Sequence, residues 1–479
     1  MNINPIQRQT LLSFGSLIAV TGLGYISTFY FAHYLGPAVL GSFFLFLAYY
    51  GIFDLIGDGG FGGAAVKRIS EGKSQNEYYS AFIILRIILL CLSILVFIII
   101  SPFLSGIQEN GLLFWLIIAL IAGTVYSIIG GNLYGTAQVG ILQVSNLINT
   151  IVKNVVQILA VFIGFGLGGL VFGFIAGMMA SVVLNLKYLR LTFTKCDRSH
   201  FQGLVSFSIW TFLSSGGALI FTYADTILIG QFMTETDVGI YRVAFQLASV
   251  ASFMAIALHT VLYPRISRWH AENNITMIEQ ALTRSFTYSL FLAIPITAGG
   301  ILLADKLLYY FYSASFESGA SVLPILLFIQ IVNIFLYLQT MCLNAMDRPK
   351  VSFYITAISA VLNVLLNILL IPIMGIWGAA IATLATLSMN AVFAYIKLRS
   401  SLHVKIDLRS TLNLVTAALG MTVFLMVYTY VFPIQSFVEL GLAISFGAML
   451  YFAVALYTDS SIRNDLKALL DTMNLPFLS

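Results

Sequence analysis

Apolar runs of about 20 residues recur along almost the whole chain, separated by short polar segments. A helix of that length crosses the hydrocarbon core of a bilayer, which is about 30 Å thick. We therefore predict an all-α integral membrane protein with about fourteen transmembrane helices. The predicted spans are residues 11–32, 39–65, 79–101, 111–133, 142–164, 167–187, 204–230, 239–262, 283–304, 321–343, 352–373, 376–397, 410–432 and 436–456.

Composition and charge agree with this class. The chain is 59% hydrophobic and 9% charged, with a mean hydropathy of +0.96, whereas soluble domains carry roughly 25% charged residues. With the N-terminus inside, 19 of the 23 Lys and Arg residues fall in inner segments, and only Lys306 falls in an outer loop. Because positive residues gather on the cytoplasmic side, we predict a multi-pass protein of the cell membrane with both termini in the cytoplasm. The net charge of +4 requires no nucleic-acid partner.

The two halves of the chain repeat one pattern. Gly169 and Gly378 stand in similar glycine-rich segments 209 residues apart, and Gly41 matches Gly239 at a distance of 198 residues. Six crossings return the chain to its starting side, so the copies are predicted to be parallel repeats, as in transporters that bind substrate between two bundles. The predicted parts are an N-terminal lobe at 1–200, a C-terminal lobe at 201–400, and two extra helices with a cytoplasmic tail at 401–479.

Four segments, in this order, carry a resemblance to a known family: Ala32–Gly41, Val66–Ser70, Ala224–Gly230 and Asn344–Lys350. Along essentially its whole length the chain resembles the Wzx-like, O-antigen-type polysaccharide biosynthesis flippases of the multidrug/oligosaccharidyl-lipid/polysaccharide exporter superfamily. The resemblance implies a two-lobed fold that moves a polyprenyl-(pyro)phosphate-linked oligosaccharide from the inner to the outer leaflet by alternating access, for cell-surface glycan assembly. It implies membrane lipids and a glycan polymerase or glycosyltransferases as partners, and no catalytic residue.

The fifth predicted helix carries the clearest polar stripe. Asn146, Lys153 and Gln157 recur on one face at helical spacing, with Asn154 beside them. Lys153 is near the middle of its span, where a charge is costly unless it faces protein or water. A phosphate and a hydrated glycan need a polar, cationic cavity, so we place these four residues in it, together with Asn363, the repeat counterpart of Asn154. For the asparagines, hydrogen bonding between helices is the alternative.

Charged residues on the second and third predicted helices allow two interpretations. Asp54 and Asp58 are one turn apart, and Arg86 lies at the depth of Asp58. Either these groups form a structural ion pair, or one acid is a proton or sodium site that couples a Na⁺ or H⁺ gradient to transport. Arg86 and its repeat counterpart Arg284 are predicted at the inner mouth of the cavity, because a guanidinium binds phosphate bidentately. Arg284 is otherwise a topology charge at the inner boundary.

Asp225 and Arg242 are expected at matching depth near the outer boundary. Their pairing is either structural or a gate latch that breaks on opening. The three cysteines and five histidines form no CxxC motif or His pair at metal-ligand spacing. We therefore predict no metal site and no cofactor apart from the coupling ion.

Two other functions remain as alternatives. One is a cation-coupled drug or metabolite exporter of the same superfamily, and the other is a membrane polysaccharide polymerase or glycosyltransferase. Basic residues within the predicted cavity favour an anionic substrate over a cationic drug. Acidic residues in the predicted outer loops are scattered, which disfavours catalysis. We predict a flippase and not an enzyme.

Overall fold

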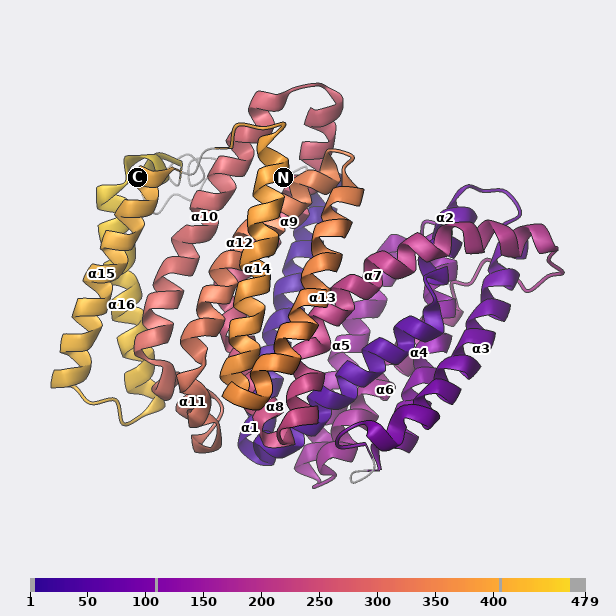
Figure 1. The fold of residues 1–479 in the computed structure, drawn as a ribbon, viewed down its shortest axis with the longest axis horizontal. Coiled ribbons are helices and arrows are strands. Elements are labelled where there is room, and N and C mark those ends of the chain that lie inside the picture. Colours follow the sequence, from indigo (N-terminus) through magenta and orange to yellow (C-terminus); the bar gives the residue numbers. More distant parts are fainter. Residues whose placement is uncertain (1–4, 108–110, 405–406, 466–479) are drawn as a thin grey trace. The chain divides into compact units, whose positions relative to one another are not determined.

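A computed structural model describes residues 5–107, 111–404 and 407–465, with side chains from Val20 onward except at residue 214. These residues form sixteen α-helices, three short 3-10 helices and no strand (Figure 1). The α-helices are α1 (Pro5–Asp58), α2 (Phe61–Ser70), α3 (Gln75–Ile100), α4 (Leu112–Gly135), α5 (Val139–Phe162), α6 (Gly166–Leu186), α7 (Arg198–Phe232), α8 (Glu235–Ser249), α9 (Phe253–Ala271), α10 (Ile275–Leu302), α11 (Ala304–Phe311), α12 (Leu323–Ala345), α13 (Pro349–Met374), α14 (Ile376–Arg399), α15 (Leu408–Val431) and α16 (Phe437–Thr458). The 3-10 helices are Ser101–Phe103, Val250–Ser252 and Ala314–Ser321.

Within the described residues, thirteen helical segments are long and apolar enough to cross a membrane. The prediction of an all-α, multi-pass membrane protein is confirmed. One of these segments, Val20–Asp58, covers parts of two predicted spans, because α1 is interrupted at Gly36, whose φ of 73° and ψ of 179° are not helical. Pro37 follows and has no N–H to continue the helical hydrogen bonds. The two arms of α1 run in opposite directions (Figure 1), which accounts for the fourteenth predicted crossing.

Packing divides the chain into two compact units. The first comprises Met1–Arg242 and Asn363–Gly375, and the second comprises Val243–Leu362 and Ile376–Ser479. The first unit therefore holds α1 to α7, the start of α8 and the last part of α13. These units follow from packing, whereas the predicted lobes at 1–200 and 201–400 follow from sequence repetition. The division into lobes stays a prediction.

Helices α5 and α6 pack closely because α6 presents a stripe of glycines. Gly169, Gly173 and Gly177 are four residues apart and lie on one face. A Cβ added at Gly177 would lie 2.9 Å from the Cβ of Lys153, and one added at Gly169 would lie 2.7 Å from the Cβ of Ala160. Small residues let two helix backbones approach in a membrane. The polar stripe of α5 is therefore the face that meets α6.

The segment that joins the two repeats is bound to the ends of α3 and α4. The backbone N–H of Arg190 donates to Asn132 Oδ1 (3.2 Å), and Asn132 Nδ2 donates to the carbonyl of Leu191 (3.3 Å). The N–H of Thr194 donates to Ser80 Oγ (2.7 Å). Asn132 is fully buried. The segment is not helical, so its backbone N–H and C=O groups have no partners within a helix. These side chains supply hydrogen bonds to them instead.

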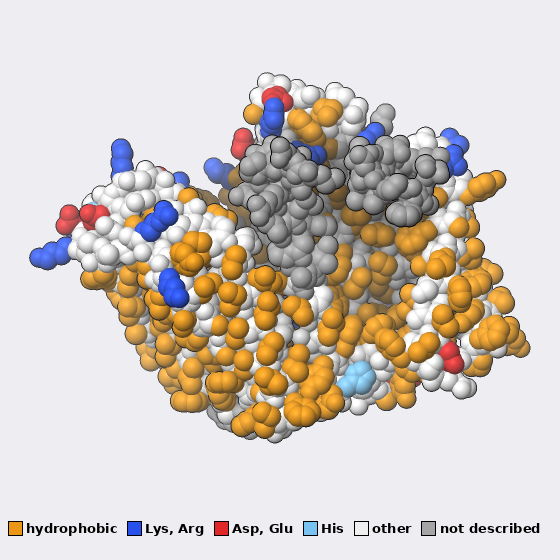
Figure 2. Space-filling model, turned by 180° about the vertical axis from the view of Figure 1, so that it is seen from behind, with side chains coloured by type: hydrophobic (Ala, Val, Ile, Leu, Met, Phe, Trp, Pro, Cys, Tyr) orange, Lys and Arg blue, Asp and Glu red, His pale blue; other side chains and the backbone are white. Residues whose placement is uncertain are grey.

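In the second unit, α15 and α16 pack on α10 (Figure 1). Leu290 of α10 joins a buried cluster with Leu414 and Leu440, and the Tyr451 hydroxyl donates to the carbonyl of Phe291 (2.9 Å). Apolar side chains cover the outer flanks of the helices in Figure 2, while Lys and Arg side chains gather toward the helix ends. Such flanks suit hydrocarbon as a solvent, because lipid chains solvate apolar side chains and exclude charged ones.

Candidate functional site

Lys153 lies on α5 in the first unit, with the start of its side chain against Gly177 of α6. It is half-buried. Among the described residues, no side chain forms an ion pair with it and no group accepts a hydrogen bond from it. A charge in this position is costly without a partner. The side chain is therefore suited to bind an anion supplied from outside the protein.

The other polar residues of the predicted stripe have protein partners. The Tyr126 hydroxyl donates to Oδ1 of Asn146, which is exposed, at 2.8 Å. Gln157 is 2% exposed and its Nε2 donates to the carbonyl of Leu170 on α6 (2.7 Å). Asn154 is buried and donates to the Thr150 carbonyl one turn earlier (2.8 Å). Gln157 thus joins α5 to α6, while its predicted contact with substrate stays a prediction.

Arg86 of α3 forms the centre of an ionic cluster with the end of α1. Its Nη2 is 2.6 Å from Asp54 Oδ1, and its Nη1 is 3.6 Å from Asp58 Oδ1. Nη1 also donates to the Asp54 carbonyl (3.1 Å). The Arg86 side chain is 1% exposed, but those of Asp54 and Asp58 are 32% and 23% exposed. The ionic interpretation of these residues therefore has direct geometric support.

This cluster stands where α1 ends and α2 begins. Asp58 Oδ2 accepts a hydrogen bond from the N–H of Gly62 in the first turn of α2 (3.3 Å). A carboxylate is favourable there because the first N–H groups of a helix have no partner within the helix. Asp58 thus accepts a hydrogen bond from the start of α2 with one oxygen and forms an ion pair with Arg86 through the other. The predicted role of Asp54 or Asp58 in ion coupling, and of Arg86 at the cavity mouth, stays a prediction.

Asp225 of α7 lies in a buried polar cluster that the sequence did not predict. Its Oδ2 accepts from the Tyr241 hydroxyl (2.6 Å), and its Oδ1 accepts from Nδ2 of Asn367 on α13 (2.8 Å). Asn367 Nδ2 also donates to Oδ1 of Asn363 (3.1 Å). All four residues are at most 7% exposed. Asn363, predicted in the substrate cavity as the counterpart of Asn154, is thus a neighbour of this cluster.

Two buried oxygens have no hydrogen-bond partner among the described residues: Oδ1 of Asn367, whose amide nitrogen bonds Asp225, and Oγ1 of Thr226, the next residue along α7. Both residues are fully buried. Buried polar atoms are nearly always satisfied, so each exception needs an explanation. A carboxylate with neutral amide and hydroxyl oxygens is a set of hard ligands that suits a cation such as Na⁺.

Arg242 of α8 approaches both Asp225 and the second arm of α1. Its guanidinium lies 5.7 Å from the centroid of the Phe44 ring, in a cation–π contact. It also lies close enough to Asp225 for the two charges to attract each other. The arrangement is compatible with the predicted latch, whose opening stays a prediction.

Arg284 lies in a different setting from its repeat counterpart Arg86. It is exposed and lines a polar cavity of about 480 Å³ in the second unit, between α10, the segment before α15 and the residues after α16. In the same region Tyr288 donates to Asp465 Oδ2 (2.6 Å), and the N–H of His403 donates to Glu279 Oε1 (2.6 Å). These bonds tie the last helices to α10. The predicted contact of Arg284 with substrate stays a prediction.

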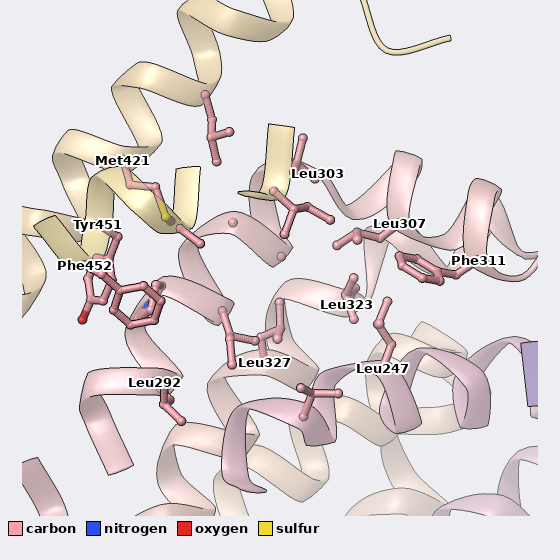
Figure 3. Close-up of a pocket in the computed structure, with 18 residues that line it drawn as sticks. Leu247, Leu292, Leu303, Leu307, Phe311, Leu323, Leu327, Met421, Tyr451 and Phe452 are labelled. Atoms are coloured by element: carbon pink, nitrogen blue, oxygen red, sulfur yellow. The ribbon is translucent and has the colours of Figure 1, made fainter. Parts of the chain in front are cut away.

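An apolar cavity of about 370 Å³ lies in the second unit between α10, α12, α15 and α16 (Figure 3). Labelled side chains converge on it from all four helices and from α8 and α11, among them Leu292, Leu327, Met421 and Phe452. Gly299 and Gly300 leave room on the α10 side. The lining has almost no polar atoms, so the cavity suits hydrocarbon.

Sequence reasoning missed several partners of these residues. Asn367 is four residues after Asn363, and this spacing placed both on one helical face. The pattern gave no indication that this face would meet Asp225, which is 142 residues away in the chain. Nothing in the sequence around Tyr241 or Gly177 indicated the contacts that these residues make, because both lie within apolar helices.

Comparison with known proteins identifies the family. The profile of the family described as "Polysaccharide biosynthesis protein" matches residues 6–270, and the MatE profile matches residues 212–369. The "Probable low-salt glycan biosynthesis flippase Agl15" of Haloferax volcanii is 28% identical over 94% of this chain and 96% of its own length. The "Probable flippase AglR" of the same organism is 27% identical over 97% of this chain and 98% of its own length.

Among solved structures, the "Lipid II flippase MurJ, inward closed conformation" has the same fold, with a TM-score of 0.75 and 16% identity over 95% of this chain and 99% of that chain. The predicted resemblance is confirmed. The matched profile covers more than half of the chain, which therefore belongs to the polysaccharide biosynthesis protein family.

Proposed function

We propose that this protein is a flippase that moves a polyprenyl-(pyro)phosphate-linked oligosaccharide from the inner to the outer leaflet of the cell membrane. The observation that carries the proposal is full-length similarity to two archaeal proteins named as flippases, one of them for glycan biosynthesis. The product would supply a glycan polymerase or glycosyltransferases that act on the outer face. On this proposal the protein is a transporter and not an enzyme, with both termini in the cytoplasm.

The two ends of such a substrate need different surroundings. A phosphate carries negative charge that hydrocarbon does not solvate, and the half-buried Lys153 has no anion to pair with among the described residues. A polyprenyl chain needs an apolar surface, which the cavity beside Leu292, Leu327 and Met421 offers. We propose that Lys153 binds the phosphate during translocation.

We further propose that a Na⁺ or H⁺ gradient drives translocation through Asp225. The supporting observation is the buried amide oxygen of Asn367, which lacks a partner among the described residues while the nitrogen of the same amide bonds the Asp225 carboxylate. Asp54 fits this role less well, because the Arg86 guanidinium already pairs with it at 2.6 Å, whereas Asp58 is 3.6 Å from the same guanidinium. Arg242 and the coupling cation would compete for the Asp225 carboxylate, so cation binding would release the predicted latch.

A second candidate function is cation-coupled export of a drug or metabolite. The MatE match at residues 212–369 favours it, since that profile covers α7 to α13 in part or whole. Lys153 has no ion-pair partner among the described residues, and its positive charge would repel a cationic drug. Susceptibility of a deletion strain to cationic drugs separates the two: an exporter predicts increased susceptibility, whereas the flippase predicts loss of the surface glycan.

Replacing Lys153 with alanine is expected to reduce translocation at least about tenfold, because the lost charge–phosphate interaction exceeds about 1.4 kcal/mol in a partly desolvated site. The measurement is protection of a fluorescent lipid-linked oligosaccharide from a glycan-cleaving enzyme in proteoliposomes. Lys153→Arg keeps the charge and should retain most of the activity. Normal translocation by Lys153→Ala would show that this lysine does not carry the phosphate.

A further inference from the structure

The second arm of α1 and the start of α8, both in the first unit, touch backbone to backbone. A Cβ at Gly41 would overlap the carbonyl of Glu235 and would lie 2.9 Å from the N of Gly239. A Cβ at Gly239 would overlap the carbonyl of Pro37. Glycine is thus required at both positions by the neighbouring backbone, and any side chain would force the helices apart.

The contact is reciprocal between the two repeats. Gly41 and Gly239 are 198 residues apart, and so are Pro37 and Glu235. Each glycine meets the backbone of the residue that precedes the other glycine by four positions. The same contact therefore occurs twice, related by a local twofold axis. Two equivalent helices that meet on such an axis leave no space between them at that level.

Close packing continues along α1 beyond the crossing. Leu45 lies against Gly230 of α7, where an added Cβ would be 2.6 Å from the leucine Cδ2. Gly51 lies against Tyr223 of α7, where an added Cβ would be 2.6 Å from Cε2. Gly41, Leu45 and Ala48 share one face of α1, and Ala48 is completely buried. No hydrated sugar fits between helices packed in this way.

We infer that the Gly41–Gly239 crossing is the outer seal of the transport pathway and that it parts when the outer side opens. The inference rests on the proposed function and orientation, which place the start of both helices at the outer face. Glycine contacts suit a seal that must open, because their backbone hydrogen bonds stay within each helix when the helices separate. Sealed in this way, the outer side stays closed while cargo enters from the cytoplasm.

The test measures access from outside, not transport. Cys91, Cys196 and Cys342 are replaced by alanine, and Ala48→Cys is added as a reporter two turns inward from the crossing. A membrane-impermeant thiol reagent is applied to intact cells. Gly41→Ala, which prevents the crossing, is expected to raise the labelling rate of the reporter about tenfold or more, equivalent to about 1.4 kcal/mol. Gly239→Ala should have the same effect from the other helix.

Gly140→Ala is the matched control, because a Cβ there meets no atom within 4 Å. It should leave labelling unchanged. Unchanged labelling in both Gly41→Ala and Gly239→Ala would overturn the inference. An increase in the Gly140→Ala control as large as in those two variants would also overturn it. Each variant is first checked for a monodisperse elution peak in detergent.

A second arm applies if the alanine variants fail that check. Pro37→Cys with Glu235→Cys is joined by a short, reducible bifunctional thiol reagent. Bridging should hold glycan translocation at less than about a tenth of the rate measured after reduction. Full translocation while bridged would overturn the seal. If labelling responds as expected but no lipid-linked glycan is moved, the seal stands and the proposed cargo is wrong.

Discussion

Asp54→Ala is expected to lower the free energy of unfolding by about 1.5–3 kcal/mol, because it removes the shortest hydrogen bond of a guanidinium that is 1% exposed. Asp58 is left at 3.6 Å, too far to replace the lost 2.6 Å contact without movement of α1. The measurement is thermal unfolding of the purified protein in detergent, followed by loss of the monodisperse peak.

Removing the other side of this cluster should be less harmful. Arg86→Met replaces the arginine with an apolar side chain about as long as its aliphatic stem, and the carboxylates left behind are 32% and 23% exposed, so water can reach them. The double change Asp54→Ala with Arg86→Met should therefore cost less than the sum of the two single changes. Strictly additive costs would show that the two side chains do not depend on each other. Asp54→Asn, which keeps an acceptor, should fall between the native protein and Asp54→Ala.

The sequence was sufficient for those features that depend on local composition and period. Hydropathy placed the apolar helices, and even the Gly36 interruption of α1 lies between two predicted spans. The depth argument brought Asp58 and Arg86 together correctly, because both are counted from the same short loop. The number of residues between a side chain and the end of its helix gives its depth in the membrane. That depth can be counted from the sequence without knowing which helices are neighbours.

The features that the sequence could not provide depend on which helix faces which. The periodicity showed a polar stripe on α5. It did not show that the amide of Gln157 donates a hydrogen bond to the Leu170 carbonyl of α6. Arg86 and Arg284 are equivalent by repeat, yet one is buried between two acids and the other is exposed in a polar cavity. Rotation of a helix about its axis is set by its neighbours, and a single chain's periodicity carries no record of them.

The Asp225 cluster is the clearest example, and it leads to the second large expected effect. Asp225→Asn is nearly isosteric and keeps atoms that can bond Tyr241 and Asn367, so the variant is expected to fold. It removes the negative charge, however, and a cation about 4 Å from a carboxylate gains about 4 kcal/mol from it in a partly screened site. Translocation driven by a gradient should therefore fall more than about tenfold.

The assay compares proteoliposomes with a Na⁺ gradient, with a pH gradient and with neither, using a fluorescent lipid-linked oligosaccharide. The native protein should be accelerated by one gradient, which identifies the coupling ion, and Asp225→Asn should lose that acceleration while keeping its rate without a gradient. A cation can shift the conformational equilibrium only by its difference in affinity between the two states, so loss of the binding charge removes the coupling and not the pathway. Asp54→Asn serves as the comparison, since its acid is paired with Arg86 and its acceleration should persist. Full acceleration in Asp225→Asn would exclude Asp225 as the coupling site. If Asp54→Asn lost the acceleration and Asp225→Asn kept it, the coupling site would lie at the end of α1.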